Sequence, residues 1–231
     1  MNSQWLIICG ILAASDAAAE TDHKHHHGGM IFHTVVAEVA ACDDRQHVDI
    51  DGRVGGDTHK FTYKIEGERH ESEWETAEVW ALYSRNVSTF WDAQVGIRQD
   101  MEPKSHAYLT AGASGLAPYF FETEAHLFVR DDGKVSARLR QENDLLLTQK
   151  WIVQPFIEIE AHAQDDLKTH IGAGFSSAEI GLQTRYEITR RFAPFIEVKH
   201  ETKLGETAAI ARRLGEDQSE TVIMAGVRAM F

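Results

Sequence analysis

The carboxy-terminal stretch from Glu220 to Phe231 alternates between two kinds of side chain. One set is almost wholly apolar: Thr221, Ile223, Ala225, Val227, Ala229 and Phe231. The other set places Arg228 among small and flexible residues. A period of two is that of a β-strand, whose successive side chains point to opposite faces. The stretch therefore predicts a strand with one apolar and one polar face, ended by an aromatic residue.

The same alternation recurs along most of the chain and predicts eleven earlier strands. We expect them near residues 34–42, 47–54, 59–70, 75–84, 91–100, 106–114, 119–130, 135–145, 151–162, 179–188 and 196–201. Several run to ten residues or more, which suits a membrane span better than the strands of about five or six residues in soluble sandwiches. Lipid outside and paired polar groups inside account for one apolar and one charged face.

An even total of twelve strands places both termini on one side of a closed sheet. The two longest connections, about 163–176 and 203–218, then fall on the opposite side, and short turns at 115–118 and 189–193 fall near the termini. Outer-membrane barrels have long outer loops and short periplasmic turns. We therefore predict an all-β fold, a transmembrane antiparallel β-barrel of about twelve strands in the bacterial outer membrane, with a soluble all-β fold as the alternative.

Charge and hydropathy restrict the partners of this chain. The 231 residues carry a formal net charge of −13. Such an acidic chain would not neutralise a phosphate backbone, so nucleic acid is excluded as a partner and cations are favoured. No run of about 18 apolar residues is present, as a membrane-spanning helix would require.

The amino terminus reads as an export signal followed by a tail. Residues 5–14 form a short apolar core, and Ala17 to Ala19 offer small residues for cleavage, although no Lys or Arg precedes the core. We expect a signal peptide at 1–19, a flexible His-rich tail at 20–33 and the barrel at 34–231. Cys9 would leave with the signal, and Cys42 alone cannot form an intramolecular disulfide.

The tail carries the clearest set of metal ligands: His23, His25, His26, His27 and Met30. Imidazole nitrogen suits Cu(II) and Zn(II), and thioether sulfur suits Cu(I), so the tract predicts metal capture with low selectivity. A solvated linker is the alternative interpretation.

Charged residues on the polar faces would meet inside the barrel. Carboxylates such as Glu122 and Glu124, beside His126, would face arginines and lysines and would have to pair with them or stay hydrated. A structural lattice of ion pairs is the favoured interpretation, and a cation-holding lumen is the other. A metal-accepting mouth is a third hypothesis, built from residues at strand ends and loops: His70, Met101, His106, His162, His170 and His200.

Enzyme signatures are absent from the sequence, which has no G-x-S-x-G, C-x-x-C or H-E-x-x-H motif. Outer-membrane hydrolases assembled from scattered residues stay as the alternative function, together with a purely structural barrel that docks a periplasmic partner.

An ordered set of short motifs resembles one known family. They are Lys64-Ile65-Glu66-Gly67-Glu68, Leu82-Tyr83-Ser84-Arg85, Phe90-Trp91-Asp92, Gly96-Ile97-Arg98, Gly115-Leu116-Ala117-Pro118-Tyr119, Asp144-Leu145-Leu146-Leu147-Thr148-Gln149, Gly215-Glu216-Asp217 and Ala225-Gly226-Val227-Arg228. Together, over roughly 47–231, they are similar to the copper resistance protein B family. The resemblance implies an outer-membrane barrel that acts in copper tolerance, binds copper as Cu(I) or Cu(II), and has a periplasmic multicopper oxidase as candidate partner. Members tend to carry a longer Met- and His-rich tract than 23–30.

Overall fold

The structure, a computed structural model, describes residues 31–71, 73–166 and 169–231. Within these residues it contains thirteen β-strands, one α-helix and one short 3₁₀ turn, η2. The elements are β1 (Phe32–Ala41), β2 (Arg45–Gly55), β3 (His59–His70), β4 (Glu73–Ser88), β5 (Trp91–Glu102), β6 (His106–Ala117), η2 (Pro118–Phe120), β7 (Phe121–Arg130), β8 (Val135–Glu142), β9 (Leu145–Leu146), β10 (Trp151–His162), β11 (Gly174–Tyr186), β12 (Phe192–Lys203), α1 (Gly205–Leu214) and β13 (Ser219–Met230).

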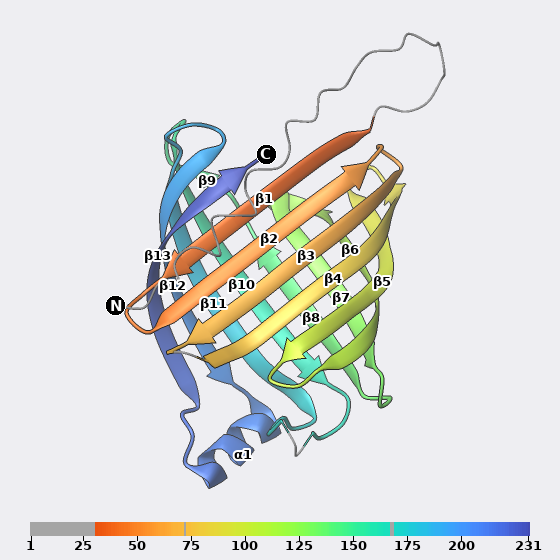
Figure 1. The fold of residues 1–231 in the computed structure, drawn as a ribbon, viewed down its shortest axis with the longest axis vertical. Coiled ribbons are helices and arrows are strands. Elements are labelled where there is room, and N and C mark those ends of the chain that lie inside the picture. The colour runs from red at the N-terminus through yellow and green to blue at the C-terminus, as the bar shows by residue number, and fades with distance from the viewer. Residues whose placement is uncertain (1–30, 72, 167–168) are drawn as a thin grey trace.

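Twelve of the described strands close into one antiparallel barrel, with strands tilted across its wall (Figure 1). Consecutive strands pair with each other, and β13 pairs with β1 to complete the ring. β9 is a two-residue addition that pairs only with β10, inside the connection from β8 to β10. Closure gives every barrel strand two hydrogen-bonded neighbours, which a lipid environment requires. The predicted twelve-strand barrel is confirmed.

Alternation along each strand separates an outer from an inner face. On β7 the His126 side chain is 4% exposed, whereas the next residue, Leu127, is 58% exposed. On β4 the same contrast separates buried Leu82 from exposed Tyr83. Apolar side chains therefore face outward and most charged ones inward, in the register that the sequence predicts.

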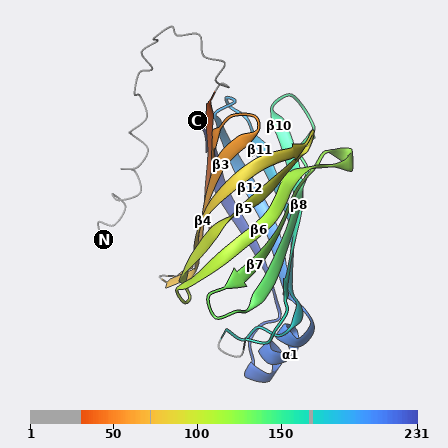
Figure 2. The same ribbon diagram turned by 90° about the vertical axis from the view of Figure 1, so that its right-hand side faces the viewer.

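The two ends of the barrel differ in their connections (Figure 2). The end that carries β1's first residue and Phe231, here called the near end, has mostly short turns. The opposite end, here called the loop end, carries the two longest connections, 163–173 and 204–218, and the second of these contains α1. The predicted distribution of loops is confirmed. Because outer-membrane barrels keep their termini and short turns in the periplasm, we assign the loop end to the cell exterior.

The interior is less polar than the sequence suggested. Trp80, Leu82 and Phe128 form one buried cluster inside the wall. A second cluster contains Ala40, Phe195, Val222 and Met224. Apolar rings therefore fill parts of the barrel that a water-filled channel would leave open.

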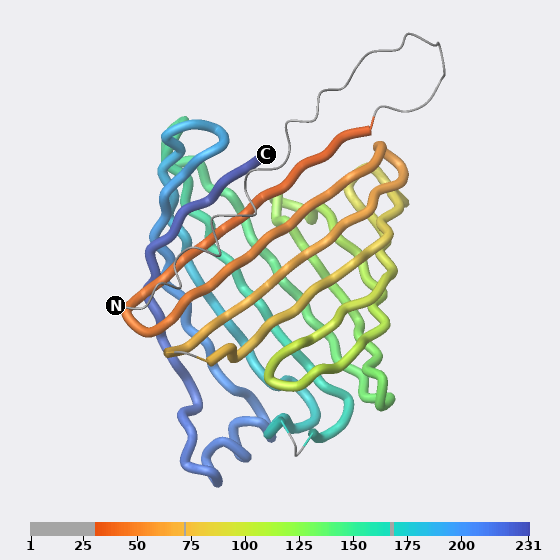
Figure 3. The backbone as a smooth tube through the Cα atoms, in the orientation of Figure 1, coloured from red at the N-terminus to blue at the C-terminus, as the bar shows by residue number. Residues whose placement is uncertain are grey.

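Several strand ends differ from the prediction: β4, β11 and β12, for example, begin two to five residues earlier than expected. β1 begins at Phe32, two residues before the expected boundary of the tail. The eighth strand was expected to reach Leu145 but ends at Glu142, and the chain then makes an eight-residue connection to β10. Tyr119 was expected on the seventh strand but lies in η2, because Tyr119 and Phe120 have φ values of 66° and 64° and reverse the chain. The path of the backbone through these turns can be followed in Figure 3.

Candidate functional site

A deep cavity enters the barrel from the loop end. Its volume is about 1120 Å³, and we call it the cup. Its wall combines eight lysine or arginine side chains, four histidines and fourteen acidic side chains. The acidic ones are Asp49, Glu66, Glu68, Glu71, Glu73, Glu75, Glu78, Asp100, Glu102, Glu158, Glu160, Asp166, Glu179 and Glu201. By formal count the wall has six more acidic than basic side chains, an excess that favours cations over anions.

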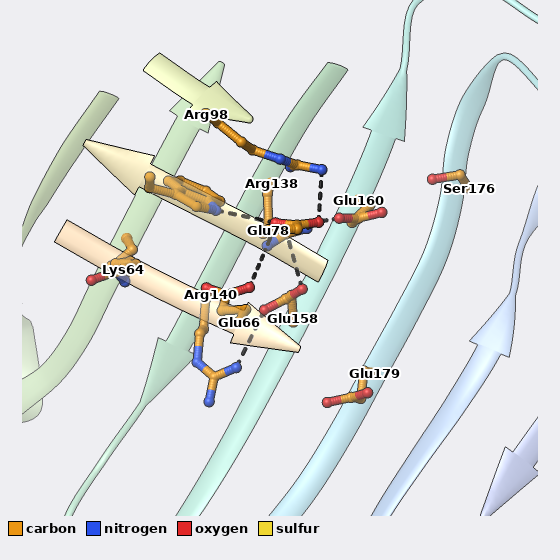
Figure 4. A network of polar contacts seen from close by, with 12 residues as sticks. Lys64, Glu66, Glu78, Arg98, Arg138, Arg140, Glu158, Glu160, Ser176 and Glu179 are labelled. Atoms are coloured by element: carbon orange, nitrogen blue, oxygen red, sulfur yellow. Dashed lines mark hydrogen bonds and ion pairs between the residues drawn. The ribbon is translucent and has the colours of Figure 1, made fainter. Parts of the chain in front are cut away.

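Arg138, one of the residues that line the cup, lies among carboxylates from other strands (Figure 4). From β8 its guanidinium reaches Glu66 on β3 at 3.1 Å and Glu78 on β4 at 3.2 Å, although neither strand pairs with β8. On β10 it also contacts Glu160 at 2.8 Å and Glu158 at 3.5 Å. One cation thus binds four carboxylates from three strands. This arrangement forms the floor of the cup.

A second ion pair crosses the barrel directly beneath this floor. Lys64 on β3 places its Nζ atom 2.5 Å from the Oε2 atom of Glu124 on β7. Between the two crossings lies a small space of about 40 Å³, which we call the chamber. Its lining residues are Asp49, Lys64, Glu66, Trp80, Glu124, His126, Arg138, Arg140 and Glu158. Since five of these also line the cup, the chamber sits immediately below it.

Ion pairs continue toward the near end. Arg228 contacts Glu38 at 2.8 Å, and Lys60 contacts Asp92 at 2.6 Å. Arg185 pairs with the Asp144 carboxylate. Ion pairs therefore extend from one end of the barrel to the other, as the alternation predicts for charges held away from bulk water, and the cup wall keeps a formal excess of acidic side chains.

The structure separates the predicted lumen residues. Glu124 and His126 line the chamber. Glu122 does not line the cup or the chamber. It lies near the opposite rim, across from Glu142 on β8.

The predicted mouth residues also divide. His70, His106 and His162 line the cup, where His70 lies between Asp44 and Glu75, 3.3 Å from each. His162 hydrogen-bonds with Ser176 at 3.0 Å. Met101 is 54% exposed and lies outside the cup lining, and the structure does not bring it to the mouth.

His170 and His200 also lie outside the cup. His170 contacts Glu216 in the loops at 3.0 Å. His200 bonds Thr221 and Thr202 with its two ring nitrogens. Six residues from separate hairpins therefore do not form one mouth, because strand parity sends some of them to the outer face.

The predicted tail ligands His23, His25, His26, His27 and Met30 lie outside the described residues, as do the expected signal peptide and its cleavage site. In the part of the chain that the structure describes, no three His, Cys, Asp or Glu side chains are grouped as they would be around a metal ion. Over the same residues no helix has the length and hydropathy to cross a membrane.

Ion pairs hold the loops at the loop end of the barrel in place. Arg130 donates to Asp132, which holds the pKa of that carboxyl well below its ordinary value. Hydrogen bonds from Lys203 and His170 likewise lower the pKa of Glu216. Because His170 and Lys203 reach the same carboxylate, both long connections are joined above the cup.

The sequence reasoning did not pick out several residues of this site. Asp49 alternates as a lumen residue should, but its place in the chamber depends on which strands lie opposite each other. Trp80 sits on an inner face, where the alternation predicts polar groups, and supports the Arg98 and Arg138 guanidinium groups against its ring. Periodicity shows whether a side chain faces inward or outward. It does not show at which height in the barrel the side chain lies or which strand it meets there.

Comparison with known proteins agrees with the geometry. A family profile described as copper resistance protein B precursor matches residues 30–231. The copper resistance protein B of Escherichia coli is 42% identical over 179 residues, covering 77% of this chain and 60% of its own length. The copper resistance protein B homolog of Pseudomonas syringae pv. tomato is 36% identical over 226 residues, covering 94% of this chain and 77% of its own. This chain therefore spans about three fifths of the Escherichia coli relative.

Solved structures share the fold at low sequence identity. The NanC porin superposes with a TM-score of 0.57 at 11% identity, covering 86% of this chain and 99% of the porin. The KdgM porin gives a TM-score of 0.54 at 10% identity, with coverage of 86% and 99%. Because the family profile spans all of the described residues, two relatives share 36% and 42% identity, and the fold is that of outer-membrane porins, the chain belongs to the copper resistance protein B family of the bacterial outer membrane.

Proposed function

We propose that this protein acts in copper tolerance by binding copper ions in its cup and providing their route across the outer membrane. The observation that carries the proposal is the charge of the cup wall, fourteen acidic against eight basic side chains around about 1120 Å³. A cation from outside the cell would be concentrated there, since a cleft of one charge sign focuses the field. The tail ligands His23 to Met30 would bind the same ion with low selectivity.

Passage through the barrel requires the floor to open. Arg138 and Lys64 bridge opposite walls, so an ion in the cup advances only when these ion pairs separate. The incoming cation would take over the carboxylates that the displaced ammonium or guanidinium group leaves, and its added charge would be offset by the excess of acidic side chains in the cup. Copper is thus the cargo of this barrel in our proposal.

Growth on copper tests the role of the cup. A strain that lacks the gene is complemented with the wild type or with Glu71→Gln, Glu73→Gln and Glu102→Gln combined, which removes three cup charges that make no ion pair in the described residues. The control variant combines Asp57→Asn, Glu187→Gln and Asp217→Asn, which lie outside the cup. The cup variant should shift copper tolerance and cell-associated copper toward the empty vector. The control should behave as wild type, and unchanged tolerance in the deletion strain would refute the proposal.

The proposed role is not enzymatic. Membership of the copper resistance protein B family and the porin-like fold support this choice over a barrel hydrolase.

A partner at the near end is a second proposal. Tyr119, Phe120 and Leu146 are all exposed there, with Tyr119 at 85%. Such a patch on the periplasmic side would suit a soluble protein, and the family resemblance suggests a multicopper oxidase. Purified oxidase encoded near this gene should bind the wild-type barrel and lose binding to Tyr119→Ser combined with Phe120→Ser. Exposed Leu109, on β6 toward the loop end, supplies the control Leu109→Ser.

A further inference from the structure

The chamber below the cup floor has the ligand chemistry of a metal site. Four carboxylates and three cationic side chains line it, together with one histidine. Its volume of about 40 Å³ has room for at least one small ion or water. The inference made here rests on the proposed function, because it takes a metal ion as the cargo.

His126 is held in one orientation by a chain of hydrogen bonds. The Gln94 side chain donates from Nε2 to Ser84 at 2.9 Å, so its Oε1 atom accepts from the His126 Nε2 atom at 2.7 Å. Ser84 in turn bonds Thr62 at 3.1 Å. This leaves the proton of neutral His126 on Nε2 and the lone pair on Nδ1. In the described residues Nδ1 has no hydrogen-bond partner.

A ring fixed through one nitrogen, with the other nitrogen free, is the usual state of a metal-binding histidine. His126 is also 4% exposed and lines the chamber. Asp49 lines the same chamber and makes no hydrogen bond or ion pair with another described residue. An imidazole nitrogen and a carboxylate without partners therefore face one space.

The remaining carboxylates are held by cations that have other partners. The Nζ atom of Lys64 lies 2.5 Å from Glu124 and 3.4 Å from Asp51. Because both carboxylates are within reach, the ammonium can pair with Asp51 alone and release Glu124. Arg138 contacts four carboxylates and keeps others when one is released. Among the described side chains no three such ligands are yet grouped around a point, so an ion would bind only after these cations move.

We propose that the chamber is a station for one divalent transition-metal ion, with His126 Nδ1 and the carboxylates of Asp49 and Glu124 as its ligands. The ion takes the place of the Lys64 ammonium, which moves to Asp51. Mixed imidazole and carboxylate ligation suits Cu(II) and Zn(II). An ion that has passed the Arg138 floor therefore stops here before it reaches the near end.

Cu(II) is the probe for the test, and the histidines of the tail are first removed so that they do not bind it. All variants carry His23, His25, His26 and His27 changed to Ala, and each is checked for a folded barrel by its heat-modifiable migration on a gel. In this background we expect one tightly bound Cu(II), with a nitrogen ligand visible in pulsed electron paramagnetic resonance. His126→Gln keeps a donor to Gln94 and should weaken that ion at least tenfold. His162→Gln removes a histidine of the cup and should leave the affinity for that ion unchanged.

Removal of the competing ammonium gives a gain that misfolding cannot imitate. Lys64→Met should raise the affinity for the tight Cu(II) at least tenfold, and Lys64→Gln by a smaller factor. Lys60→Met, which breaks an ion pair near the periplasmic rim, is the matched control and should have no effect. Weakening by His126→Gln together with strengthening by Lys64→Met supports the station. Any other pattern overturns it.

The outcome is distinguishable from failure of the proposed function. If the deletion strain tolerates copper as well as the wild type but the chamber binds Cu(II) as described, the station stands and the tolerance role falls. If tolerance depends on the protein but His126→Gln binds as its parent does, the station falls alone.

Discussion

The backbones of Phe231 and Val35 are joined by two reciprocal hydrogen bonds, of 2.9 and 3.0 Å. The last residue thus continues the pairing of β13 with β1 beyond Met230 and holds the seam that closes the ring. Its side chain points outward and is 54% exposed, where lipid would surround it. Both the backbone and the ring of Phe231 therefore serve closure of the barrel.

Deletion of Phe231, or Phe231→Asp, should reduce insertion into the outer membrane far more than Met230→Asp. A charge at Phe231 lies on the lipid-facing side, whereas Met230 belongs to the inward set of β13. The measurement is the yield of folded protein in outer-membrane fractions. Equal yields for the two aspartate variants would contradict this role.

Glu124→Leu should destabilise the barrel by on the order of 3 kcal/mol, because Lys64 loses its nearest carboxylate inside the wall. Ala125→Leu, one residue further and on the outer face, should be nearly silent. Unfolding by denaturant in detergent, followed by tryptophan fluorescence, compares the two. The reverse ranking would mean that the two side chains exchange faces, which the register of β7 does not allow.

Replacement of His23, His25, His26 and His27 by Ala should leave assembly unchanged and lower the number of copper ions bound per chain. Imidazole must lose its proton to bind metal, so the difference should shrink below the ordinary histidine pKa of about 6.5. Copper titrations of both proteins at about pH 7.5 and about pH 5 measure this. Identical stoichiometry at the higher pH would make the tail a linker and leave copper binding to the barrel.

The contact among Glu216, Lys203 and His170 should weaken in acid. The pKa of Glu216 is lowered in the folded protein, so this contact contributes stability above the unfolded glutamate pKa, and that contribution is lost as pH falls through the folded value. The protection of 204–218 against hydrogen exchange, relative to the intrinsic rate at each pH, should therefore fall below about pH 4 in the wild type. Glu216→Gln should show less protection at neutral pH and a smaller loss of protection in acid. The same response in both proteins would assign the change to other groups.

The sequence predicts the barrel well because lipid imposes one rule on every strand. Alternation such as His126 beside Leu127 shows which side chains face inward, and loop lengths then place the two ends. The prediction fails at the turns, where the chain is no longer a membrane-spanning strand and alternation no longer decides its conformation. Tyr119 continues the alternation of β7 in sequence but sits at a positive φ, and Leu145 follows a strand that has already ended.

The candidate site could be predicted only in part. The sequence places Glu124 and His126 in the lumen, but the contact of Arg138 with Glu66 joins residues from nearly opposite walls. Such a contact depends on barrel diameter and on the tilt of each strand, which a single strand's pattern does not contain. Met101 shows the reverse limit, because its place near a strand end resembles a mouth position while its parity directs it outward.

The cup opens at the loop end, and the chain that precedes Ile31 joins the barrel at the near end. In the proposed function, the two candidate copper sites, the cup and the segment from His23 to Met30, would therefore face different compartments, the cup the medium and the segment the periplasm. In intact cells, a chelator too large for porins would strip copper from the cup and leave copper on the tail. Bound copper would thus divide into two pools that differ in access, in pH and in the reductants they meet, although a single polypeptide holds both.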